Sequence, residues 1–214
     1  MDDKDYGQED ARGHWAPDRP ISYGPAFDWP PDPKRLVKWL FGFPGYFLPW
    51  NLFYAAMALV LWTWFSPSLE MTKELAPGWI GYLLLRNEIL AVLVYGAWHL
   101  WLYSWKRQGV QFKYNRQFPR DKSPGFRFGN QTWDNMFHTL ASGVPIWTGY
   151  EVLMLWAYAN GWAPMIGFAS HPIGFVAVFF LVPLIHEVGF YFCHRLLHFS
   201  PLYEIAHKLH HRNI

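Results

Sequence analysis

Half of the ten histidines in this 214-residue chain fall within its last 21 residues, at spacings suited to holding a metal ion. The first group is His194-Arg195-Leu196-Leu197-His198, and the second is His207-Lys208-Leu209-His210-His211. Residues four apart on an α-helix share one face, about 5–6 Å apart. His194 and His198 can therefore bind one ion from adjacent turns, and His207 and His211 repeat the spacing with His210 as a neighbour. Neutral imidazole is a ligand for iron, zinc, copper and nickel.

A helix-start signal separates the two groups of histidines. Serine is favoured at the position that caps a helix N-terminus, and proline at the first helical position, so Ser200-Pro201 marks the beginning of a new helix. The pattern predicts a helix, a tight turn and a second helix that folds back. Both groups of histidines should then meet.

These residues resemble the fatty acid hydroxylase and sterol desaturase superfamily of integral-membrane di-iron oxygenases. Its first box, His-x-x-x-His with Arg after the first His, matches His194 to His198, and its second, His-x-x-His-His, matches His207 to His211. Glu187 stands seven residues before the first box, where the family tends to place an acidic residue. Seven residues make two helical turns, so the Glu187 carboxylate can orient an imidazole N–H. The aromatic run Phe190-Tyr191-Phe192 is also similar to the family.

The resemblance implies a function, a cofactor and partners. Two non-haem iron ions would use O2 and electrons from an external electron-transfer protein, such as a cytochrome or ferredoxin, to hydroxylate or desaturate a sterol-like or fatty acyl lipid. The catalytic metal ligands would be His194, His198, His207, His210 and His211, with Glu187 supporting them. The family carries a further histidine box downstream, whereas this sequence stops at Ile214. We therefore expect a truncation before the third box, and a chain that is inactive alone.

A membrane protein that binds or transports a divalent metal is the alternative interpretation of the histidines. Transporters usually place polar ligands near the midplane of their spans, whereas both boxes follow the last apolar stretch. Iron content with O2-dependent product formation would favour the oxygenase, and metal flux without oxygen use would favour the transporter.

The composition predicts that membrane helices position this site. The chain is 52% hydrophobic and 21% aromatic but only 16% charged, below the quarter or so that is usual in soluble domains. Four apolar stretches cover residues 46–65, 79–103, 140–162 and 173–193. We expect an all-α integral membrane protein with about four transmembrane helices and a cytoplasmic helical cap that carries the histidines. The basic residues do not form an aromatic-studded surface, which argues against nucleic acid as a partner.

Three regions follow from this pattern. Residues 1–38 form a Pro-rich cytoplasmic arm, residues 39–193 the transmembrane helices, and residues 194–214 the start of an incomplete di-iron catalytic domain. The resemblance is sharpest over residues 184–213.

Other polar residues have less specific interpretations. Arg86, Glu88 and Glu151 lie in apolar stretches and must face protein or water; we expect an Arg86–Glu88 or interhelical ion pair. Cys193 is expected to be a small buried hydrophobe. The remaining histidines are interpreted as interfacial or incidental: His14, His99, His138, His171 and His186. Of these, His138 is the best additional ligand, and a peripheral ligand role for His186 stays open.

Loop charges predict the orientation in the membrane, because cytoplasmic loops are enriched in Lys and Arg. With four spans, sixteen of the eighteen Lys and Arg residues fall on one side, Lys73 falls on the other, and Arg86 lies inside a span. Both termini should therefore be cytoplasmic. Cysteines introduced into residues 70–77 should react with an impermeant thiol reagent added outside, and cysteines in residues 106–127 should not. Labelling of the second loop from outside would contradict this topology.

Overall fold

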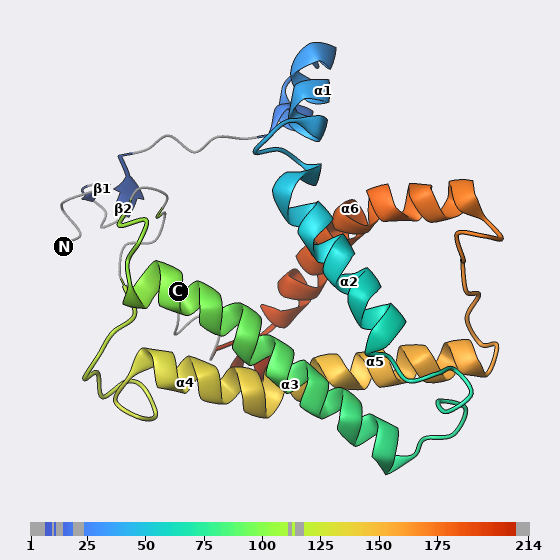
Figure 1. The fold of residues 1–214 in the computed structure, drawn as a ribbon. Coiled ribbons are helices and arrows are strands. Elements are labelled where there is room, and N and C mark those ends of the chain that lie inside the picture. Colours follow the sequence, from blue (N-terminus) through green and yellow to red (C-terminus); the bar gives the residue numbers. More distant parts are fainter. Residues whose placement is uncertain are drawn as a thin grey trace. The chain divides into compact units, whose positions relative to one another are not determined.

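The computed structural model of this chain describes residues 7–9, 11, 15–18, 24–110, 113 and 118–208. Over these residues the protein is mostly helical, as the sequence predicts (Figure 1). It divides into two compact units. Unit 1 comprises Met1–Met71 and Ala76–Phe118, and unit 2 comprises Thr72–Leu75 and Pro119–Ile214.

Unit 1 begins with a small β-ribbon that the all-α prediction did not include. Strand β1 (Gly7–Glu9) pairs antiparallel with β2 (Trp15–Pro17), followed by the short 3-10 helix η2 (Pro25–Phe27). Helix α1 (Pro33–Phe41) comes next. It begins on a proline, and the Asp32 carboxylate caps it by accepting hydrogen bonds from the amides of Lys34 and Arg35, at 2.9 and 3.3 Å.

The rest of unit 1 is a helical hairpin. A π-turn, η3 (Phe47–Asn51), leads into α2 (Leu52–Trp64), and α3 (Pro77–His99) continues as the π-turn η4 (Leu100–Ser104). Contacts occur at both ends of the pair: Trp50 packs on Trp98 with ring centroids 5.1 Å apart, and Tyr82 bonds to the carbonyl of Phe65. The two helices therefore run in opposite directions.

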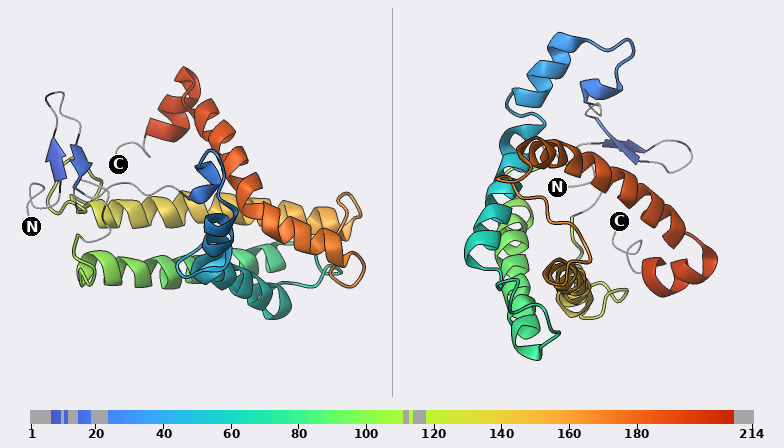
Figure 2. Two further views of the ribbon diagram at one scale, coloured as in Figure 1. Left: turned by 90° about the horizontal axis from the view of Figure 1, so that it is seen from above. Right: turned by 90° about the vertical axis from the view of Figure 1, so that its right-hand side faces the viewer.

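Unit 2 contains two long helical segments. Helix α4 (Gln131–His138), the π-turn η5 (Thr139–Gly143) and α5 (Val144–Ala159) follow one another without a break (Figure 1). Helix α6 (Pro172–Leu197) curves along its length, with Pro183 in its interior, and is followed by α7 (Ser200–Leu202) and the π-turn η6 (Tyr203–His207) (Figure 2). Proline removes one backbone donor from a helix and so favours curvature.

Three helices of the described chain are long and apolar enough to cross a membrane, which marks the chain as a membrane protein. They are Phe47–Trp64, Pro77–Ser104 and Pro172–Leu197, with mean hydropathies of 1.2, 1.4 and 2.1. They match three of the four apolar stretches in the sequence. The remaining stretch, 140–162, is helical through η5 and α5 but is not among these three helices. Four spans therefore stay a prediction.

Most of the apolar surface of these helices is exposed. Helix α6 has no buried residue, and this exposure suits a helix whose neighbours are lipid chains. The prediction that Cys193 is buried was wrong, because its thiol is exposed on α6. An apolar sequence environment shows only that a side chain avoids water, and it does not show whether protein or lipid surrounds it.

Arg86 joins the two helices of the hairpin. Its side chain is buried, and its Nη1 donates to the carbonyl of Phe65, the residue that ends α2, at 3.0 Å. Its Nε and Nη2 both donate to Oδ1 of the fully buried Asn87, at 3.1 and 2.8 Å. A cation is well placed at a helix C-terminus, where backbone carbonyls lack helical partners. The expected Arg86–Glu88 or interhelical ion pair stays a prediction.

Replacing Asn87 should destabilise the α2–α3 hairpin more than removing the hydrogen bond that Tyr82 donates to the carbonyl of Phe65. Asn87→Leu leaves two buried guanidinium N–H groups without their acceptor, which should lower the free energy of unfolding by about 1–3 kcal/mol or more. Tyr82→Phe, the matched control, removes one hydrogen bond of 3.2 Å to Phe65 and should cost about 0.5–1.5 kcal/mol. Unfolding in mixed micelles followed by circular dichroism measures both. Equal stability losses would contradict the role given to Asn87.

Candidate metal centre

Three histidines from two separate segments meet beyond the end of α6. His194 lies in the last turn of α6, His198 caps that helix, and His207 ends η6. One ligand nitrogen from each lies within 4.8 Å of the other two. The ring centroids are 4.9 Å apart for His194 and His198, 4.6 Å for His194 and His207, and 4.7 Å for His198 and His207. The three imidazoles thus form a nearly equilateral triangle.

The dimensions of this triangle suit a single transition-metal ion. An imidazole–metal bond is about 2.0–2.1 Å long, so adjacent nitrogens that share one ion lie about 2.8–3.4 Å apart in octahedral or tetrahedral geometry. Nε2 of His194 and Nε2 of His198 are 3.1 Å apart. Two imidazoles at that distance need only small side-chain rotations to bind the same ion. The donor set, all imidazole, fits iron, zinc, copper or nickel.

The third ligand depends on a tight reversal of the chain. The amides of His198 and Phe199 donate to the carbonyls of Arg195 and Leu196, at 3.2 and 3.0 Å, and end α6. Figure 2 shows the chain after α6 turning back beside the end of that helix. The new helix begins at Ser200 with a proline in its first turn, where the sequence predicts it. Phe199 occupies the capping position, however, and the Ser200 side chain makes no cap.

Aromatic rings hold the imidazoles in place. Phe190 lies one turn before His194, with ring centroids 5.4 Å apart, and His186 stacks on Phe190 at 6.2 Å. Tyr203 lies against His198 and His207, at 5.9 and 6.1 Å. His207 is the most enclosed of the three ligands and is only 4% exposed. Tyr203 was not among the predicted site residues, although its four-residue spacing from His207 is a signal present in the sequence.

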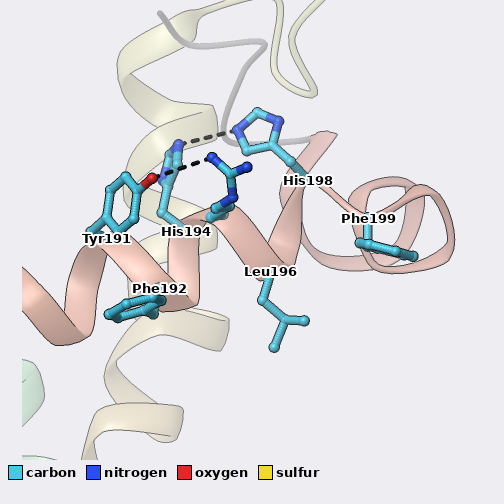
Figure 3. A pocket seen from close by; sticks show the side chains of 7 residues that line it. Tyr191, Phe192, His194, Leu196, His198 and Phe199 are labelled. Carbon is cyan, nitrogen blue, oxygen red and sulfur yellow. Dashed lines mark hydrogen bonds between the residues drawn. The ribbon is translucent and has the colours of Figure 1, made fainter.

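An open cavity of about 700 Å³ adjoins the histidine pair. Its lining residues are Tyr191, Phe192, His194, Arg195, Leu196, His198 and Phe199. Figure 3 shows His194 and His198 on one side of α6, while Phe192 and Leu196 project from the other side. The Tyr191 hydroxyl accepts a hydrogen bond of 3.2 Å from Nη1 of Arg195, which fixes the guanidinium beside the imidazoles. Apolar surface and metal ligands therefore lie at the same helix end.

Charged residues near the triangle are exposed. Nζ of Lys208, the residue after His207, donates to Oε2 of Glu204 at 2.8 Å, and this hydrogen bond raises the pKa of Lys208. Glu187 is also exposed, and its carboxylate lies 3.6 Å from Nδ1 of His186. Among the described residues no hydrogen bond joins Glu187 to His194 or His198. Its role in orienting a ligand stays a prediction.

The other histidines are dispersed or lie outside the described residues. His14, His210 and His211 lie outside the described residues. His138 is 3.8 Å from the buried carboxylate of Asp134. His171 contacts Ser170. His99, in unit 1, lies against Tyr103. None of these three belongs to the triangle formed by the described histidines.

Comparisons of this chain with protein-family models, curated proteins and solved structures found no match.

Loss of His207 should weaken metal binding by more than the loss of a residue that only supports a metal ligand. His207→Ala removes one of three ligand nitrogens, and the remaining pair comes from one helix alone, so Co2+ affinity should fall by more than the roughly 10–100-fold typical of supporting residues. The control is His171→Ala, an exposed histidine outside the triangle, which should bind Co2+ normally. Competition titration of the detergent-solubilised protein, read from the Co2+ absorption bands, measures the affinities. Equal affinity of both variants would exclude His207 as a ligand.

Proposed function

We propose that this chain carries part of the metal centre of a membrane-bound, non-haem iron oxidoreductase that hydroxylates or desaturates a lipid. The observation that carries the proposal is the meeting of His194, His198 and His207 within 4.8 Å at the end of an apolar helix. The resemblance of both histidine groups to the boxes of the fatty acid hydroxylase and sterol desaturase superfamily supports it.

The described residues fit a first metal ion. His194, His198 and His207 would hold it, and three imidazoles leave further positions open for oxygen and water. A second ion would draw on His210 and His211, which lie outside the described residues. When bound, iron would supply the activation of O2 and the oxidation of an unactivated C–H bond. Hydroxylation consumes one O2, two electrons and two protons and releases one water, and the electrons would come from an external cytochrome or ferredoxin.

The chain itself would place the substrate and hold the ligands. Phe199, next to His198 in the chain, offers apolar surface to an acyl chain or a steroid at the cavity, whereas Phe192 and Leu196 on the other side of α6 would contact the surrounding lipid (Figure 3). Tyr203 and Phe190 restrict rotation of the imidazoles that they contact. A site at the end of a membrane helix can be reached by a lipid that stays in the bilayer, so little hydrocarbon need be exposed to water.

A metal transporter is the alternative function. Transported ions usually bind near the middle of spans, on broken helices. The triangle instead lies at the end of α6, with His198 beyond its last residue, and this position favours catalysis over transport.

Activity measurements on variants test the proposal. In the full-length protein, His194→Ala, His198→Ala or His207→Ala should each abolish iron binding and O2-dependent lipid oxidation, because each removes a bond to the metal. Glu187→Gln should lower activity by only about 10–100-fold, and His171→Ala should leave it unchanged. The assay is iron content and product yield in isolated membranes at equal expression.

If the His194→Ala variant oxidised lipid at a near-normal rate, the proposed metal centre, and with it the proposed oxidoreductase function, would be contradicted. Uptake of a divalent metal into vesicles without oxygen consumption would establish the transporter instead.

A further inference from the structure

Helix α1 is amphipathic, and all charged residues within it are cations. At 100° per residue, Lys34, Arg35 and Lys38 share one side of Pro33–Phe41. Leu36 and Leu40 lie on the opposite side, Val37 and Trp39 lie on its two edges, and Phe41 lies next to Lys34. A nine-residue helix is too short to be stable alone in water. It therefore needs surroundings that offer apolar contacts to its apolar side and water or anionic groups to its cationic side.

The protein covers only part of the apolar face. Trp39 packs on Tyr46, with ring centroids 5.0 Å apart, but Val37, at the edge of that face, remains 56% exposed, and Phe41, beside Lys34, is 61% exposed. Aromatic side chains on both sides of the helix extend this apolar surface, since Trp29 is 91% exposed and Phe43 is 77% exposed.

The start of the first membrane helix keeps α1 close to the bilayer. Only residues 42–46 separate α1 from the candidate span Phe47–Trp64, and five residues reach less than about 18 Å. The connection is also tight: the amide of Tyr46 donates to the carbonyl of Trp39 at 2.8 Å. A Cβ at Gly45 would collide with that same carbonyl. α1 thus stays within the depth of a headgroup layer.

The cations complement an anionic surface. Arg35 pairs with Asp28 at 2.7 Å. Lys34 and Lys38 are exposed and have no acidic partner among the described residues. Lysine can keep its alkyl stem on apolar surface while its ammonium reaches outward to phosphate.

We propose that α1 lies in the headgroup layer, with Val37 and the flanking aromatics Trp29 and Phe43 toward the acyl chains, and that Lys34 and Lys38 bind the phosphates of anionic phospholipids. Each lysine should favour this position about fivefold on an anionic surface. The site is built from unit 1 residues alone and does not depend on the metal centre.

Nitroxides on single cysteines, in the full chain with Cys193→Ser, test the position of α1 in nanodiscs. The Val37→Cys label should collide mainly with O2, and the Lys34→Cys label mainly with a water-soluble Ni2+ chelate. Adding phosphatidylglycerol to phosphatidylcholine discs should move the Val37 label to a greater depth in the bilayer. Lys34→Gln with Lys38→Gln should abolish that lipid dependence, while Lys122→Gln, an exposed cation of unit 2, should retain it.

Three results would overturn the proposal. Equal access of the Ni2+ chelate to both labels would mean a solvated helix. Shielding of the Val37 label from both reagents would mean a protein partner. If the depth of the Val37 label did not change when phosphatidylglycerol was added, the proposed binding of anionic phospholipids by Lys34 and Lys38 would be wrong.

Discussion

The reversal of the chain at His198 and Phe199 is the constraint on which the candidate metal centre depends. One helix can offer two imidazoles from adjacent turns, but a third from the same face would lie a further turn away, beyond the reach of one ion. His207 reaches the pair only because α6 stops and η6 returns beside it. The π-turn, which is wider than an α-helical turn, places Tyr203 and His207 on the side that contacts His198.

Sequence spacing was sufficient for the parts of this site that local geometry determines. The four-residue interval between His194 and His198 implies contact on any helix, and Pro201 implies a new helix after a turn. The capping residue was not predictable in the same way: Ser200 is a good cap by type, yet Phe199 takes that position, because the turn is set by backbone bonds to Arg195 and Leu196. Which of two adjacent residues occupies the capping position of a helix depends on the geometry of the whole turn.

Contacts between distant segments were the part that sequence could not supply. The sequence did not point to the bonds that the Arg86 guanidinium makes to Asn87 and to the carbonyl of Phe65. Every residue offers a backbone carbonyl, so no residue type in the sequence marks the one at the end of α2 as the acceptor. Cys193 shows the same limit for apolar residues, since hydrophobicity predicts avoidance of water and leaves open whether lipid or protein provides it.

The same physical requirement, a change from hydrocarbon to polar surroundings over a few residues, governs both α1 and the histidine triangle. α6 is apolar through its first half, and polar residues gather toward its C-terminal end, from His186 and Glu187 to His194 and Arg195. α1 makes the change laterally, with cations on one side and Leu36 and Leu40 on the other. If the predicted four-span topology holds, α1 would precede the first span and the triangle would follow the last, which would put both at one membrane surface. The lipid substrate of the proposed oxidoreductase would then pass through that layer on its way to the metal.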